Sequence, residues 1–240
     1  MATDLFDLTD RVAVVTGGSR GLGREMVLAF AAQGADVVIA SRKLENCELV
    51  AAEVEARGRR GLAVPYHAAI WEDSDRLAGT VMAEFGRCDV LVNNAGMSPL
   101  YPSVDAITED LYDKVMGVNL KGPFRLSALL GTAMAEGDGG SIIFVSSIAS
   151  HRPSPSELVS GAAKAGVNNL AYGLARTFGP KVRVNCIVPG PLLTDISKAW
   201  DLDAVEEHAR RDISLGRGWR PEEIVGAALY HASDATSSTT

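Results

Sequence analysis

The chain has 240 residues, of which 47% are hydrophobic and 22% are charged, and its formal net charge is −7. This composition is typical of an ordinary globular domain, so we expect residues 1–240 to form a single domain. The acidic charge, with a pI near 5.2, argues against nucleic acid or an anionic membrane as a partner, because a polyanion is not attracted to the molecule as a whole. We expect a small-molecule partner instead.

The cysteines predict neither a disulfide framework nor a metal site. The chain has three cysteines, an odd number, and none are spaced as Cys-x-x-Cys: Cys47, Cys88 and Cys186. The acidic N-terminus, MATDLFDLTDR, has no apolar run of signal-peptide length, and no later segment reaches the roughly 18 apolar residues of a membrane span. We therefore expect a cytoplasmic protein.

From Arg11 onward, short β-branched runs alternate with longer segments of helical periodicity. The strands are predicted at 12–16, 36–40, 61–66, 89–93, 141–146 and 182–188. The helices are predicted at about 21–33, 43–57, 72–85, 107–135, 155–178 and 221–232. This alternation predicts an α/β fold, a doubly wound parallel sheet flanked by helices on both faces.

The segment 191–218 differs in texture from the rest of the chain. It contains LLTDISKAW and then the charged stretch DLDAVEEHARR, which together predict a loop with short helices outside the sheet. In an open α/β sheet, such insertions usually lie over the carboxyl ends of the strands, where ligands bind. We therefore expect a substrate lid over 191–218.

A glycine-rich turn, TGGSRGLG, joins the first predicted strand to the first helix. Gly17, Gly21 and Gly23 would let backbone amides and the helix N-terminus approach a pyrophosphate, because a Cβ would obstruct that approach. We include Ser19 and Leu22, which lie between the glycines, among the cofactor-binding residues. The alternative is a tight turn without a ligand.

The end of the second strand reads Ser41, Arg42, Lys43, where an NAD site normally carries a carboxylate for the ribose 2′-hydroxyl. Arg42 can pair with a 2′-phosphate and stack on adenine, and Arg20 can approach the same phosphate from the glycine turn. We therefore expect NADP(H) rather than NAD(H). The alternative is two solvated surface arginines.

Five motifs occur in a specific order: TGGSRGLG, NNAG at 93–96, the Asn of GVNLKG, a Ser followed by a helical Lys, and VNCIVPG. Together they resemble the short-chain dehydrogenase/reductase family, over about residues 11–237. The resemblance implies a Rossmann-type fold and an oxidoreductase that acts on a carbonyl or an alcohol. It also implies the residues that line or close the nicotinamide end of the cofactor: Asn93, Ala95, Gly96, Pro189, Gly190, Leu192 and Thr194.

The resemblance implies three catalytic roles as well. Asn119 would hold a water that feeds a proton relay, and Ser147 would hydrogen-bond the substrate carbonyl or hydroxyl. Lys164 would bind the nicotinamide ribose and lower the pKa of a tyrosine one helical turn earlier. The local sequence predicts the helix itself, with Ser154 and Glu157 forming a capping box and positions 160 and 164 on one face.

That tyrosine is absent, because its position, four residues before Lys164 and thirteen after Ser147, is occupied by Ser160. A phenol has a pKa of about 10, whereas an aliphatic hydroxyl ionises nearer the value of water, about 15.7. Ser160 should therefore not act as a general acid, should not reach a carbonyl held at Ser147, and should leave a gap for a water. Such a loss costs about 10²- to 10⁴-fold in rate, so residual activity is expected.

Other side chains are weak replacements for the tyrosine. We expect Tyr112 in the core and Tyr172 two turns beyond Lys164. Tyr101, in the loop after NNAG, and His151, after Ser147, are expected to be loop residues.

Two further departures from the family pattern are expected to matter. His67 stands about where the family often has an Asp that contacts adenine. The sequence ends at SDATSSTT, where the family continues into a seventh strand and a glycine pair, so we expect that strand to be missing.

Three hypotheses about function follow: an NADP(H)-dependent oxidoreductase impaired at position 160, a non-catalytic nucleotide-binding sensor or scaffold, and a lyase or isomerase. Retention of Asn119, Ser147 and Lys164 favours the first. By analogy with the family, the long helices at 107–135 and 155–178 imply a homodimer or homotetramer. The expected substrate is a small to medium ketone or alcohol, from the mostly apolar cleft candidates Met97, Ser98, Pro99, Leu100, Tyr101, His151 and Arg152.

Overall fold

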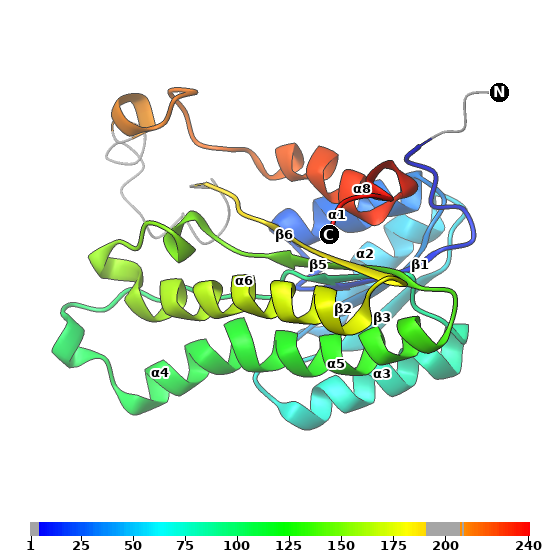
Figure 1. Ribbon diagram of the computed structural model, residues 1–240, viewed down its shortest axis with the longest axis horizontal. Coiled ribbons are helices and arrows are strands. Elements are labelled where there is room, and N and C mark those ends of the chain that lie inside the picture. Colours follow the sequence, from blue (N-terminus) through cyan, green and yellow to red (C-terminus); the bar gives the residue numbers. More distant parts are fainter. Residues whose placement is uncertain (1–4, 191–206, 208) are drawn as a thin grey trace.

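The computed structural model describes residues 5–190, 207 and 209–240, and in it six parallel strands form one sheet between two layers of helices (Figure 1). The strand order is β3-β2-β1-β4-β5-β6, so the direction of winding reverses between β1 and β4. An open parallel sheet offers its ligand crevice at such a point. The predicted strands are confirmed to within one residue at each end: β1 Val12–Thr16, β2 Asp36–Ser41, β3 Gly61–Pro65, β4 Val90–Asn93, β5 Gly140–Val145 and β6 Val182–Ile187.

The helices α1, α2 and α8 cover one face of the sheet, and α3, α5 and α6 cover the other (Figure 1). Their bounds are α1 Gly21–Ala32, α2 Leu44–Glu55, α3 Trp71–Phe85, α4 Glu109–Met116, α5 Gly122–Glu136, α6 Leu158–Phe178 and α8 Val225–Ala232. Short 3₁₀ turns link them: η1 Val104–Ala106, η3 Ile148–Ser150, η4 Pro155–Glu157, η6 Pro221–Ile224 and η7 Asp234–Thr236.

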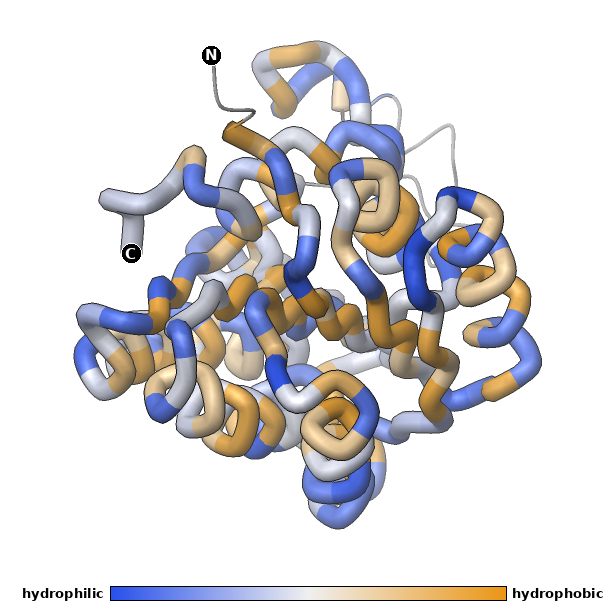
Figure 2. The backbone as a smooth tube through the Cα atoms, turned by 90° about the vertical axis from the view of Figure 1, so that its right-hand side faces the viewer, coloured by the Kyte–Doolittle hydropathy of each residue, from blue (hydrophilic) through white to orange (hydrophobic). Residues whose placement is uncertain are grey.

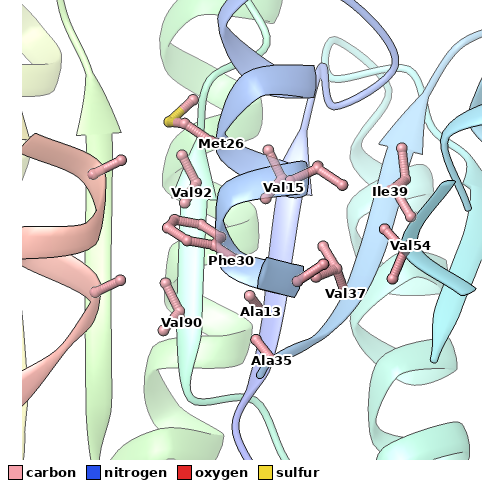
Figure 3. Close-up of a cluster of buried hydrophobic side chains, with 14 of the residues drawn as sticks. Ala13, Val15, Met26, Phe30, Ala35, Val37, Ile39, Val54, Val90 and Val92 are labelled. Atoms are coloured by element: carbon pink, nitrogen blue, oxygen red, sulfur yellow. The ribbon is translucent and has the colours of Figure 1, made fainter. Parts of the chain in front are cut away.

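The strands are continuous apolar runs because hydrophobic clusters cover both faces of the sheet. Met26 and Phe30 of α1 pack on Ala13 and Val15 of β1 and on β4, all fully buried (Figure 3). The alternate residues of β1, such as Val14, belong to the cluster on the opposite face. Strands covered on both faces need apolar side chains at every position. The strands in the middle of the molecule accordingly show as hydrophobic, whereas the helices around them carry both hydrophobic and hydrophilic residues (Figure 2).

The helix predicted over 107–135 is confirmed over residues 109–136, but it is not a regular α-helix throughout. It consists of α4, a π turn, η2 Gly117–Lys121, and α5. The glycine that begins the turn and the one that follows it pack directly on the chain after β3: a Cβ on Gly117 would lie 2.8 Å from Ala69 Cβ, and one on Gly122 would lie 2.0 Å from Ala68 O. The extra residue of a π turn rotates the following side chains, and Asn119 lies fully buried within it.

The capping box predicted at the start of α6 is also wrong. Ser154 Oγ donates to the Glu157 carboxylate at 3.1 Å and makes no bond to a backbone N–H. Glu157 has φ −128° and ψ 19°, outside the helical region, so residues 155–157 form a 3₁₀ turn and α6 begins at Leu158. Positions 160 and 164 nevertheless share one face of α6, as predicted.

Within the described residues, the sheet ends at β6. Val184 N donates to Thr240 Oγ1 at 2.9 Å and Asn185 Nδ2 donates to Thr239 O at 3.0 Å, so residues 239–240 lie along that edge. Leu192, Thr194 and most of the predicted lid, at 191–206 and 208, lie outside the described residues. In the described ranges, no helix combines the length and apolar character that a bilayer span requires.

Candidate functional site

The turn from β1 into α1 is shaped for a close backbone approach. Gly17 and Gly21 adopt φ +66° and +51°, in the left-handed region that favours glycine. A Cβ on Gly23 would lie 2.2 Å from Gly17 O, so only glycine fits there. The first turn of α1 carries no acidic residue, so its unpaired N–H groups keep their positive potential. This arrangement suits a phosphate.

Two residues that the sequence reasoning missed, Thr16 and Asn94, hold this turn in place. Thr16 Oγ1 accepts from the N–H groups of Asn94 and Ala95 at 3.0 and 3.1 Å. Asn94 Nδ2 donates to Thr16 O at 2.9 Å and to Gly17 O at 3.3 Å. The second Asn of NNAG was the available signal. Asn93, by contrast, is buried and donates to Ser127 Oγ of α5 at 2.8 Å.

Two arginine side chains flank the glycine-rich turn. Arg20 and Arg42 are exposed and form no ion pair in the part of the chain that the structure describes. Arg24, one turn into α1, is paired with Glu53 at 2.6 Å. Ser41, at the end of β2, is half-buried, and no carboxylate stands beside it in the sequence. The charges at this end of β2 therefore suit an anionic group.

The predicted residues Gly96, Asn119, Ser160 and Lys164 come together beside the end of β4. Asn119 Oδ1 accepts from Met97 N at 2.9 Å, and its Nδ2 donates to Met97 O at 2.8 Å and to Ser160 Oγ at 3.2 Å. A Cβ on Gly96 would lie 3.5 Å from Asn119 Oδ1 and 3.6 Å from Lys164 Nζ. The π turn thus brings Asn119 to the face of α6 that carries Ser160 and Lys164.

Lys164 is buried, and its Nζ donates to Val145 O, at the end of β5, at 2.6 Å. Burial lowers the pKa of Lys164 to about 8, although the neighbouring Cys186 on β6 acts in the opposite direction. The group therefore stays mostly protonated near pH 7, but it loses its proton far more readily than an exposed lysine does.

Ser147 lies just after β5 in an ordered turn. Its Oγ accepts from Ala149 N at 3.1 Å, which leaves the hydroxyl hydrogen free to donate. Ser150 Oγ donates to Ser147 O at 2.6 Å, and Asn168 of α6 donates to Ser150 Oγ at 2.9 Å. Ile148 N donates to Pro189 O at 3.0 Å, which sets the turn of Pro189 and Gly190 beside Ser147.

The Ser160 hydroxyl is directed at protein groups, since it accepts from Asn119 and lies 3.5 Å from Met97 O, to which it donates. Next to it is a cavity of about 10 Å³, close to the volume that one water needs. The cavity is lined by Pro99, Tyr101, Leu111, Val115, Ser156, Glu157, Val159 and Ser160.

The other candidate acids occupy defined positions. The Tyr101 hydroxyl is bonded to Pro155 O at 2.6 Å and to Leu158 N at 2.9 Å. His151 is exposed, with Nε2 3.3 Å from Asn168 Nδ2. Tyr112 is 48% exposed, so its predicted place in the core is wrong. His67 Nδ1 accepts from Ala69 N at 3.3 Å within its own turn.

Comparison with known proteins assigns most of the chain to one family. The family described as short chain dehydrogenase matches residues 11–204. The chain is 31% identical to human "Dehydrogenase/reductase SDR family member 4", covering 97% of this chain and 84% of that one. It is 36% identical to "L-rhamnose 1-dehydrogenase (NAD(P)(+))" of Azotobacter vinelandii, covering 95% and 91%. A 3-oxoacyl (acyl-carrier-protein) reductase from Agrobacterium tumefaciens with NADP bound superposes with a TM-score of 0.92 at 30% identity, covering 98% and 92%.

Proposed function

Because the chain belongs to the short-chain dehydrogenase/reductase family of NAD(P)-dependent oxidoreductases, we propose that it interconverts a carbonyl and an alcohol by hydride transfer with NADP(H). We propose further that Ser160 makes this turnover slow. The observation that carries the proposal is the convergence of Asn119 and Lys164 beside Gly96, with Ser147 at the end of the adjacent strand.

The residues present fit a nicotinamide dinucleotide. The Gly17–Gly23 turn and the start of α1 would hold the pyrophosphate, and Lys164 would hold the nicotinamide ribose near Gly96. Arg20 and Arg42 would hold a 2′-phosphate, which supports NADP(H) over NAD(H). The bound nicotinamide supplies or accepts the hydride. The NADP in the similar bacterial reductase supports this choice.

The chain's own residues would bind and polarise the carbonyl. The free hydrogen of Ser147 Oγ would bond the carbonyl oxygen, and the charge of Lys164 would stabilise negative charge that develops there. Ser160 ionises too weakly to donate the proton, so water would have to supply it. General acid catalysis typically contributes about 10²- to 10⁴-fold to the rate. Turnover should therefore be slower by about that factor than in the same site with a tyrosine at position 160.

Turnover of NADPH with ketones would test the proposal, using cyclohexanone, 2-octanone and acetophenone. Ser160→Tyr should raise kcat by about 10²-fold or more, because it restores a phenol beside Lys164. Ser160→Phe is the matched control, since it fills the same space without a hydroxyl and should give no such gain. Tighter binding of NADH than of NADPH would contradict the roles of Arg20 and Arg42.

A non-catalytic NADP(H)-binding sensor or scaffold is the alternative, and one observation favours it. The Ser160 hydroxyl is engaged by Asn119 and Met97, as a purely structural residue would be. If Ser160→Tyr turned over none of the ketones while NADPH still bound tightly, this alternative would replace the enzyme.

We also propose that the chain forms a homodimer or homotetramer. A groove of about 400 Å³ lies where η2, α5 and α6 meet. It is lined by Met116, Leu120, Lys121, Phe124, Gly166, Asn169 and Leu170. An apolar hollow on the outer layer of helices suits the same surface of a second copy.

A further inference from the structure

The segment Met97–Tyr101, here called the strap, is held at both ends. At its first residue, both backbone groups of Met97 are bonded to the side chain of Asn119, at 2.9 and 2.8 Å. Asn119 is fully buried in the π turn, so this end of the strap has a rigid partner.

At the other end, the Tyr101 hydroxyl is bonded to the turn η4 and to the first residue of α6. It donates to Pro155 O at 2.6 Å and accepts from Leu158 N at 2.9 Å. Leu158 is the first residue of α6, and its N-cap residue, Glu157, makes no side-chain capping bond. The first N–H groups of a helix have no acceptor within the helix. Tyr101, which lies 57 residues before Leu158, supplies one of these acceptors.

The middle of the strap lies beside position 160. Pro99 and Tyr101 line the small cavity that Ser160 and Val159 also line. Leu100 is 59% exposed, so the strap packs inward through Pro99 and Tyr101 and turns Leu100 outward. The strap thus forms a wall next to the residue whose identity sets the proton chemistry.

We propose that Tyr101 is a positioning residue for substrate binding: its hydroxyl fixes the strap to η4 and to the first residue of α6, and so holds in place the wall beside position 160. This inference rests on the proposed function. With both ends held, the strap is already ordered before a substrate binds, so binding costs little conformational entropy. Without the bonds of Tyr101, the strap would have to become ordered on binding, and this cost would weaken the affinity for the substrate. Tyr101 acts on the substrate through the strap and does not take part in proton transfer.

Tyr101→Phe tests the proposal, because it removes the two hydrogen bonds and keeps the ring. It is made in the Ser160→Tyr background and in the original chain. The KM for 2-octanone and acetophenone should rise roughly three- to tenfold, while kcat and the Kd of NADPH change less than about twofold. Hydrogen exchange at the Leu158 amide should become at least about tenfold faster.

Tyr172→Phe is the matched control, since Tyr172 lies on α6 itself and is 76% exposed. It should change neither KM nor the exchange of Leu158. An unchanged KM with faster Leu158 exchange would reduce Tyr101 to a helix cap and overturn the proposal, and so would a kcat that falls in step with thermal stability.

Failure of the proposed function would be distinguishable from failure of this inference. If the Ser160→Tyr protein turned over no ketone, the function would fail. The strap would then be tested by binding of acetophenone to the protein with NADP⁺, measured by calorimetry. Tyr101→Phe should weaken that binding by the same factor, and unchanged or undetectable binding would overturn the inference.

Discussion

Lys164 places a buried ammonium group at the centre of the candidate site. Its pKa is lowered by burial from an ordinary value of 10.5 to about 8, and its Nζ has one protein acceptor, Val145 O, among the described residues. The folded protein therefore binds this proton less tightly than the unfolded chain does. A buried ammonium group without a partner charge does not stabilise the folded protein. It is, however, already positioned to bind an anionic cofactor.

Lys164 should therefore contribute a rise in the stability of the folded chain with pH through the window between about 8 and 10.5, against the opposing effect of the Cys88 and Cys186 thiols, whose pKa values burial raises. In that window the unfolded chain holds the Lys164 proton and the folded chain does not, so raising the pH favours folding, by at most about 3 kcal/mol. Urea unfolding of the chain and of Lys164→Met at pH 7.5 and pH 10 isolates this contribution, because stability should change more favourably with pH in the chain than in the variant. Equal changes in the two proteins would show that Lys164 makes no such contribution.

At the scale of elements, the π turn η2 sets the position of α5 and of Asn119. Gly117 begins this turn and Gly122 follows it, and a Cβ on either would come too close to the chain after β3: to Ala69 Cβ for Gly117 and to Ala68 O for Gly122. Without the turn, Asn119 would fall on a different face of the helix, away from Met97 and Ser160. A local irregularity in a helix therefore places Asn119 within the candidate site, in contact with Met97 and Ser160.

Gly122→Ala should destabilise the fold by about 2–4 kcal/mol, because its Cβ would meet Ala68 O at 2.0 Å and backbone has to move. Gly79→Ala is the control, since Gly79 lies within α3 and nothing lies within 4 Å of its Cβ position. It should be neutral or stabilise by about 0.5–1 kcal/mol. Chemical denaturation of the two variants decides, and similar midpoints would contradict the packing argument.

At the scale of the whole molecule, the groove of η2, α5 and α6 is the surface proposed for self-association. Phe124 lines it and is 40% exposed, so a charge there should disfavour burial against a second copy. Phe124→Glu should shift the mass measured by light scattering toward that of the 25.3 kDa monomer. Leu49→Glu is the control, because Leu49 is 68% exposed on α2, on the opposite layer. Equal masses for the two variants would place the interface elsewhere.

The predictability of the elements follows from how local their causes are. Runs such as Val12–Thr16 are apolar at every position because a central parallel strand is covered on both faces, so the six strands were found to within one residue. The helix ends were harder. The residues 154–157 match a capping box in sequence, but Glu157 leaves the helical region and a tyrosine from a distant loop caps α6 instead.

The amino-acid sequence by itself determined the α/β architecture, the glycine turn, and the register that places Ser160 four residues before Lys164. These depend on periodicity and spacing along the chain. Only the tertiary structure decided that Asn119 lies in a π turn bonded to Ser160, that Thr16 and Asn94 hold the glycine turn, and that Tyr101 joins the strap to α6. Each of these contacts joins residues more than 40 positions apart. No local pattern encodes such a partner, because only the packing of the helices on the sheet brings the two residues together.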